Sequence, residues 1–186
     1  GEALEITFEI SKIEKLKKNI KKYIPSNFDY AMLPTEGRIK KALLADLEST
    51  VIQDECIDEI ASMVNKKNEI KNITSMAMNG KIDFSDSLRK RILILKGTKI
   101  DILEKVYNNI TINPGITTLV KTMSHYGAKT ILVSGGFDFF AKRISKKLGF
   151  TNHYANYLIV ENEKLAGTVK EPILDAHAKK NIIKKL

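Results

Sequence analysis

The chain has 186 residues, 43% of them hydrophobic and 28% charged, which is enough to bury one good core and a small second lobe. Its single cysteine, Cys56, cannot form an internal disulfide, and no run approaches the roughly 18 apolar residues that a membrane-spanning helix needs. Because the amino terminus also lacks a signal-peptide pattern, we expect a soluble cytoplasmic protein without a membrane partner.

A net charge of +9 raises the question of a nucleic-acid partner. Much of the excess lies in residues 12–22 and 179–185, where lysines fall mainly between the apolar positions of helix-like segments. This pattern is typical of a solvated helix face, and neither interleaved aromatic residues nor a helix-turn-helix pattern accompanies it. We therefore expect no nucleic-acid partner, and a nucleic-acid-binding module is an alternative that only the charge supports. The sequence does not indicate an oligomeric state.

The amino-terminal part of the chain has its own pattern. Residues 3–10 alternate between apolar and polar side chains, which predicts a half-buried strand, and apolar residues at helical spacing from Ile13 to Tyr23 predict a helix. The segment Pro34–Gly37 then reads as a linker. We interpret residues 1–36 as a strand–helix segment, consistent with the end of a separate regulatory module, and residues 37–186 as the core.

Strand and helix patterns alternate from residue 41 onward. An apolar run predicts a strand that ends at Asp46, and a helical insertion follows it. The later elements are a helix at about 114–126, a strand at 129–133, a helix at 137–148, a hairpin from 157–160 and 165–169, and a helix from about 174. This order predicts right-handed βαβ units and a parallel sheet.

Polar residues follow both predicted strands of that sheet. Asp46 and Glu48 follow the first, and Ser134-Gly135-Gly136 follows the second, so we expect them at one edge of the sheet. The backbone of the second segment could bind an anion, and Asp46 could attack a phosphoryl group that Glu48 protonates at its leaving oxygen. Lys179 and a divalent metal would neutralise the phosphoryl charge. A capped turn at Asp46 and a plain glycine turn at Gly135 are the structural alternatives.

Several segments together resemble the haloacid dehalogenase-like phosphatases, and within them the phosphoserine phosphatases. Asp46-Leu-Glu-Ser-Thr50 is similar to the family's nucleophile loop, Asp-x-Asp-x-Thr. Residues 55–61 follow this loop, residues 73–84 and 87–91 resemble the family's helical cap, and Leu132-Val-Ser134-Gly-Gly-Phe-Asp138 and Ala178-Lys179 resemble its second and third motifs. The resemblance implies an α/β fold: a three-layer, Rossmann-like parallel sheet with a helical cap inserted at about 54–110.

The resemblance also implies an activity, which is the hydrolysis of O-phosphoserine in serine biosynthesis through an aspartyl-phosphate, with Mg²⁺ as cofactor. Carried over by position, Asp46 is the nucleophile and a metal ligand, and Glu48 is the general acid and base and offers its carbonyl to the metal. Lys179 balances charge on the phosphoryl group. The substrate-binding residues would be Glu55 at the ammonium, Arg91 at the carboxylate, Met78 and Phe84 closing over the substrate, and Ser134 and Gly135 at the phosphoryl oxygens.

Two departures from the family pattern affect these expectations. Glu48 stands where the family has aspartate, and one extra methylene moves the acid by on the order of 1 Å. The sequence also ends at Leu186, before the Gly-Asp-Gly-x-x-Asn-Asp segment that completes the family's metal site. We therefore expect that the C-terminal part of the sheet is missing and that the chain is a fragment. The alternatives are an impaired relative that binds a small phosphorylated amino acid and a phosphatase of another small phosphate ester.

Overall fold

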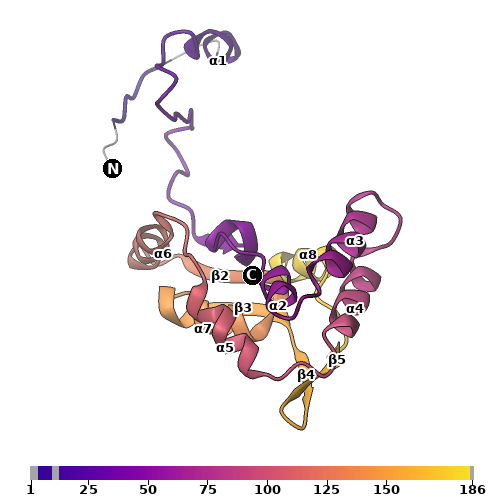
Figure 1. Cartoon of the computed structure of the whole chain (residues 1–186). Coiled ribbons are helices and arrows are strands. Elements are labelled where there is room, and N and C mark those ends of the chain that lie inside the picture. The colour runs from indigo at the N-terminus through magenta and orange to yellow at the C-terminus, as the bar shows by residue number, and fades with distance from the viewer. Residues whose placement is uncertain (1–3, 10–12, 185–186) are drawn as a thin grey trace. The chain divides into compact units, whose positions relative to one another are not determined.

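The computed structural model describes residues 4–9 and 13–184, which divide into two compact units, Gly1–Lys40 and Lys41–Leu186 (Figure 1). The first unit contains the predicted helix, α1 (Ile13–Ile20). The strand predicted at 3–10 is wrong for residues 4–9, which form no regular element. Alternation produces a strand only where a neighbouring strand takes its backbone hydrogen bonds, and the described residues of this unit offer none. The assignment of residues 1–36 to a regulatory module stays a prediction.

The second unit contains the predicted alternation of strands and helices. Its strands are β1 (Ala42–Ala45), β2 (Lys129–Phe137), β3 (Asn152–Asn156), β4 (Leu158–Glu161) and β5 (Lys164–Val169). Its helices are the wide turn η1 (Leu47–Val51), α2 (Cys56–Met63), α3 (Lys67–Met78), α4 (Phe84–Ile94), α5 (Asp101–Asn109), α6 (Ile116–His125), α7 (Asp138–Leu148) and α8 (Ala176–Lys184). No helix among the described residues has the length and apolar character that crossing a bilayer would require.

The main sheet is parallel, as predicted, with the strand order β1-β2-β3. Leu44 pairs with Ile131, and Val133 pairs with Tyr154. Because both crossovers move in the same direction across the sheet, right-handed connections place α6 and α7 on one face. In the described residues β1 pairs only with β2, and this edge position explains why the strand is partly rather than fully buried. The missing part of the sheet stays a prediction.

Two features of this sheet differ from the pattern in the sequence. The strand β3 was not predicted, because Asn152-His-Tyr-Ala-Asn156 is short and largely polar. Strand β2 also runs past the predicted end at 133 to Phe137, with a shift in register between Val133 and Phe137. The segment Ser134–Gly136, which we predicted as a loop, is therefore an irregular continuation of a strand.

Helices α2 to α5 form the inserted cap, and α3 and α4 lie side by side (Figure 1). The hairpin of β4 and β5 also packs against α4. Backbone hydrogen bonds join it to the end of that helix: Gly97 N–H donates to Leu165 O at 2.8 Å, and Leu165 N–H donates to Thr98 O at 2.8 Å. The hairpin was predicted from the sequence, but its place beside the cap was not.

One continuous apolar core holds the cap to the sheet. Ile70 and Ile92 of the cap belong to the same buried cluster as Leu132 and Phe140 beneath it, and all four are fully buried. Burying an aliphatic or aromatic side chain contributes about 1.5–3 kcal/mol. The position of α4 over the ends of β1 and β2 is therefore fixed by core packing as well as by polar contacts.

Candidate active site

A cavity of about 190 Å³ lies where the carboxyl ends of β1 and β2 face the cap helix α4. It mixes charged side chains from the strand ends and the cap with apolar side chains and glycine backbone. The residues that line it are Asp46, Glu48, Glu55, Ile57, Phe84, Leu88, Arg91, Gly135, Gly136, Phe137 and Lys179. The cavity thus brings together seven of the nine site residues predicted from the sequence: Asp46, Glu48, Glu55, Phe84, Arg91, Gly135 and Lys179.

Asp46 occupies the point where β1 ends and η1 begins. Its Oδ1 accepts a hydrogen bond from the backbone N–H of Leu47 at 2.9 Å, and its Oδ2 lies 3.0 Å from Nζ of Lys179. Lys179 comes from α8, so the fold brings this cation across the chain to the strand end. The ion pair and the N–H bond orient the carboxylate, whose oxygen can act as a nucleophile.

Glu48 is held in extended backbone, at φ −70° and ψ 140°, and its Oε1 accepts a hydrogen bond from Cys56 N–H at 3.2 Å. Burial raises the pKa of Glu48 to about 7, and the nearby charges of Glu55 and Asp46 add to this effect. The Cys56 N–H and the Arg91 guanidinium act in the opposite direction. A carboxyl group with a pKa near neutrality can both donate and accept a proton, as a general acid and base must.

The irregular end of β2 passes directly beneath the two carboxylates and the cap. A Cβ at Gly136 would lie 2.5 Å from Oε2 of Glu48, and a Cβ at Gly135 would lie 2.8 Å from Cζ of Phe84. A larger residue at either position would require the facing side chain to move. Ser134 does not line the cavity: it is fully buried, and its Oγ accepts a hydrogen bond from Gly136 N–H at 2.8 Å. In this arrangement its hydroxyl orients the glycine backbone.

The cap contributes one anionic and one cationic group. Oε1 of Glu55 accepts a hydrogen bond from Oγ of Ser49 at 2.7 Å, which links the start of α2 to η1. Desolvation lowers the pKa of Arg91, although the carboxylates of Asp58, Glu48 and Glu55 oppose that effect. The guanidinium keeps most of its donors for a ligand, because its one hydrogen bond in the described chain runs from Nε to Ser87 O at 3.3 Å.

Met78 is a predicted substrate-binding residue that the structure does not place at the cavity. It ends α3 with 84% of its surface exposed and does not line the cavity, so its contact with a substrate stays a prediction. Sequence reasoning also missed three apolar lining residues, Ile57, Leu88 and Phe137. The helical spacing from Phe84 to Leu88 and Arg91 on α4 was a signal that could have found Leu88.

The residues around the cavity fit a magnesium ion only in part. Asp46 offers a carboxylate and Glu48 a backbone carbonyl, but both Asp46 oxygens already have partners in Leu47 N–H and Lys179. Among the described residues no group of three or more His, Cys, Asp or Glu side chains is arranged to hold a metal ion. Mg²⁺ prefers six oxygen ligands, some of them waters, so these residues alone are a weak ligand set.

Comparison with known proteins extends these observations. The family model for haloacid dehalogenase-like hydrolases matches residues 43–185. A phosphoserine phosphatase of Archaeoglobus fulgidus is 35% identical over 160 residues, which are 85% of this chain and 46% of the relative. A phosphoserine phosphatase of Methanocaldococcus jannaschii is 41% identical over 147 residues, which are 79% of this chain and 70% of the relative.

Solved structures agree with the fold described above. A phospho-aspartyl intermediate analogue of phosphoserine phosphatase superposes with a TM-score of 0.73 and 41% identity, over 78% of this chain and 70% of that one. This likeness confirms the predicted α/β architecture with a parallel sheet. The chain spans 46% of the length of the first of these curated relatives and 70% of the second.

Proposed function

Because the chain belongs to the haloacid dehalogenase-like hydrolases, we propose that it acts as a phosphoserine phosphatase, which converts O-phospho-L-serine and water to L-serine and phosphate. The observation that carries the proposal is the meeting of Asp46, Lys179 and Glu48 in one cavity beneath Arg91. Relatives that bear the name phosphoserine phosphatase support the choice of substrate.

In the first proposed step, an oxygen of Asp46 attacks phosphorus while the bond from phosphorus to the serine oxygen breaks. Glu48, protonated at and below a pH of about 7, gives its proton to that oxygen, so serine leaves as a neutral alcohol. Phosphorus is then bound to Asp46 as an aspartyl-phosphate. Lys179, 3.0 Å from Asp46, balances the negative charge that is brought to the carboxylate.

In the second proposed step, water hydrolyses the aspartyl-phosphate. The ionised Glu48 takes a proton from the attacking water, the bond between phosphorus and Asp46 breaks, and inorganic phosphate forms. Glu48 ends the cycle protonated and Asp46 ends it ionised, as both began. A pKa near neutrality suits this exchange, because neither the acid nor the base form of Glu48 is costly to reach.

The cap would select the amino-acid end of the substrate. A guanidinium binds a planar carboxylate through paired hydrogen bonds, so Arg91 suits the serine carboxylate. Glu55 suits the ammonium group, and Phe84 covers Gly135 at the phosphoryl end. These three positions lie along one cavity, so a substrate with one cation and two anionic groups would meet a partner for each.

Magnesium is the cofactor that the family generally uses, and it would offset phosphoryl charge when bound. Asp46 and the Glu48 carbonyl would hold it, with waters at the other positions. Because this ligand set is small, binding of Mg²⁺ to this chain should be weak. Isothermal titration with Mg²⁺ measures the affinity, and tight binding would contradict this expectation. A place in serine biosynthesis and a cytoplasmic location are part of the same proposal.

The test of the function is phosphate release from O-phosphoserine by the protein and by its Asp46→Asn variant. The amide is nearly isosteric but a poor nucleophile, so turnover should fall below detection while the thermal unfolding transition persists. Asp101→Asn is the matched control, because it also removes one carboxylate, on α5 and outside the cavity. Turnover by the Asp46→Asn variant close to that of the wild type would exclude the proposed nucleophile.

A second candidate function follows from Glu48. Its side chain is one methylene longer than aspartate and is committed to Cys56 N–H at 3.2 Å, so proton transfer could be too slow for turnover. The protein would then bind a small phosphorylated amino acid without hydrolysing it. Equilibrium dialysis with phosphoserine separates the two functions, since a pure binder retains the ligand intact and releases no phosphate. Turnover of other phosphate esters in preference to phosphoserine would change the substrate but not the chemistry.

A further inference from the structure

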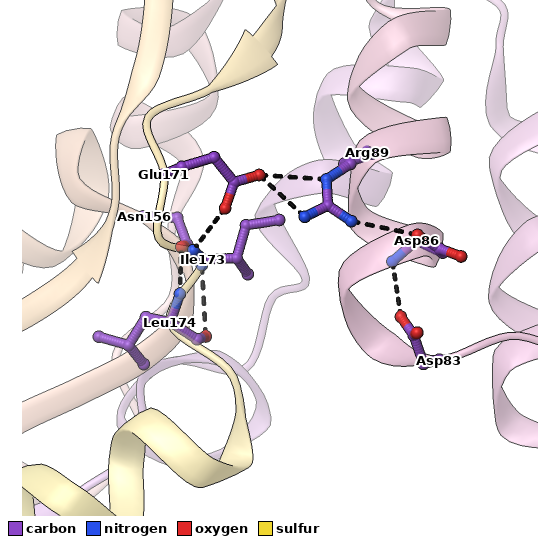
Figure 2. A network of polar contacts seen from close by, with 7 residues as sticks. All are labelled: Asp83, Asp86, Arg89, Asn156, Glu171, Ile173 and Leu174. Carbon is purple, nitrogen blue, oxygen red and sulfur yellow. Dashed lines mark hydrogen bonds and ion pairs between the residues drawn. The ribbon is translucent and has the colours of Figure 1, made fainter.

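Asn156, the last residue of β3, is a buried polar side chain that the proposed reaction does not use. Only 2% of its surface is exposed. Its Nδ2 donates to Gly135 O at 2.8 Å. Its Oδ1 accepts from Leu174 N–H at 2.7 Å (Figure 2). A second, longer contact of 3.5 Å joins Nδ2 to Leu174 O. A buried amide with partners on both sides holds those partners at a fixed distance.

The first partner is the backbone beneath the phosphoryl end of the cavity. The peptide between Gly135 and Gly136 has its carbonyl bonded to Asn156 and its N–H bonded to Ser134 Oγ at 2.8 Å. Both polar atoms of that peptide are therefore fixed, and so is its plane. Because Gly135 and Gly136 have no side chains that could pack against neighbouring residues, the two hydrogen bonds set the orientation of their backbone.

The second partner leads to the helix that carries Lys179. Leu174 directly precedes Asp175, whose Oδ1 accepts from Ala178 N–H at 2.8 Å and whose carbonyl accepts from Lys179 N–H at 3.0 Å. The first turn of α8 is thus built on the residue next to the one that Asn156 holds. At the other end of that turn, Nζ of Lys179 reaches Asp46 at 3.0 Å.

The segment before Leu174 is held from the cap side. Glu171 accepts from Ile173 N–H at 3.0 Å, and it also accepts from Nε and Nη2 of Arg89, on α4, at 3.1 and 2.9 Å (Figure 2). Arg89 is itself paired with Asp86 at 3.1 Å. The ion pairs of Arg89 are exposed to solvent, whereas Asn156 is buried and Ile173 belongs to the apolar core. Asn156 is therefore the buried polar contact that joins this segment to the end of β2.

We propose that Asn156 is a positioning residue, which sets the backbone of Gly135 and Gly136 and the helix bearing Lys179 at the separation that phosphoryl transfer requires. The inference rests on the proposed phosphatase function. It predicts a role at the phosphoryl end of the substrate only, since neither Gly135 nor Lys179 belongs to the cap. Arg91, by contrast, would act at the amino-acid end.

The test is Asn156→Asp, which keeps an acceptor for Leu174 N–H but points a carboxylate oxygen at Gly135 O instead of a donor. We expect kcat/KM to fall by about 100-fold, the order of loss that a displacement of 1 Å can cause. The loss should be equal for phosphoserine and for p-nitrophenyl phosphate, because both present the same phosphoryl group. A loss confined to phosphoserine would overturn the proposal.

Thr130→Val is the matched control, because Thr130 is also a fully buried polar residue of the same sheet, bonded to Thr151 rather than to the cavity. It should lower the unfolding temperature while leaving kcat within about twofold of the wild type. If Asn156→Asp also keeps kcat within twofold, Asn156 is merely structural and the proposal is wrong. Should Asn156→Asp fail to fold, Asn156→Ser replaces it, with an expected loss of about tenfold on both substrates and the same criterion.

A second measurement tests the role of Asn156 independently of the proposed phosphatase function. Inorganic phosphate is titrated into ¹⁵N-labelled wild-type and variant protein, and the amide resonances of Gly135 and Gly136 are followed. We expect at least tenfold weaker phosphate affinity in the variant. If the wild type hydrolyses neither ester, the proposed function fails, and this titration decides on Asn156 by itself. Equal affinities, or no response of these amides in either protein, would overturn the positioning role.

Discussion

Replacing Glu48 with glutamine should remove a pH dependence of stability that the Glu48 carboxyl imposes on the metal-free protein. Burial is the main cause that raises the pKa of Glu48 from its ordinary 4.5 to about 7. The folded protein consequently holds this proton more tightly than the unfolded chain does. Glutamine is nearly isosteric, can accept the same hydrogen bond from Cys56 N–H, and does not titrate.

The size and sign of the effect follow from the two pKa values. A difference of about 2.5 corresponds to about 3 kcal/mol, at about 1.4 kcal/mol per pKa unit. The stabilising contribution of the protonated form is fully present below about pH 4.5. It is lost as the pH rises through about 7, because the unfolded chain releases its proton first. The free energy of unfolding should therefore fall in the wild type, relative to Glu48→Gln, by about 3 kcal/mol across this window.

Urea unfolding measures this difference. The experiment is run from pH 4 to pH 8 in steps of about half a pH unit, with a chelator present and at constant ionic strength. Glu59→Gln is the matched control, because Glu59 is an exposed carboxylate on α2 outside the cavity. If the curves for the wild type and Glu48→Gln run parallel to within about 0.5 kcal/mol, burial does not raise the pKa of Glu48 as argued.

Three further predictions concern the cavity and the core. Arg91→Ala should lower kcat/KM for phosphoserine at least tenfold more than for p-nitrophenyl phosphate, because only phosphoserine loses paired hydrogen bonds, and equal losses would make Arg91 structural. Gly136→Ala places a Cβ 2.5 Å from Glu48 Oε2, so steady-state kinetics should show kcat lower by about 10- to 100-fold, and an unchanged kcat would contradict the close approach. Ile60→Ala, in the fully buried core, should cost about 2–5 kcal/mol in urea unfolding, and a much smaller cost would show that the core there is loosely packed.

The chemistry of the cavity was predictable because it begins with local patterns. An apolar run that stops at Asp46, and another that leads into Ser134-Gly135-Gly136, indicate strand ends without any knowledge of the fold. Parallel pairing of β1 with β2 then brings both ends to one edge of the sheet. The roles of Glu55 and Arg91 came from the resemblance to a family, since both would otherwise pass as ordinary surface charges.

Other features could not be predicted, because they depend on contacts between distant segments. The alternating pattern of residues 4–9 forms no strand, whereas the polar segment 152–156 forms β3 because it has β2 as a partner. Met78 reads as an apolar cap residue, yet its position at the end of α3 leaves it exposed. The sequence pattern of a segment indicates which structures it can form, and the segments that pack against it determine which of these it adopts.

The sequence by itself therefore determined the alternation of strands and helices from residue 41 onward apart from β3, the parallel pairing of the strands, and the identity of most groups at the cavity. Only the tertiary structure decided how those groups behave. The 3.0 Å contact of Lys179 with Asp46 and the hydrogen bond from Asn156 to Gly135 join residues far apart in the chain. The raised pKa of Glu48 arises mainly from desolvation, which depends on every element packed around it. Periodicity is a property of one segment, whereas distance and dielectric environment are properties of the folded whole.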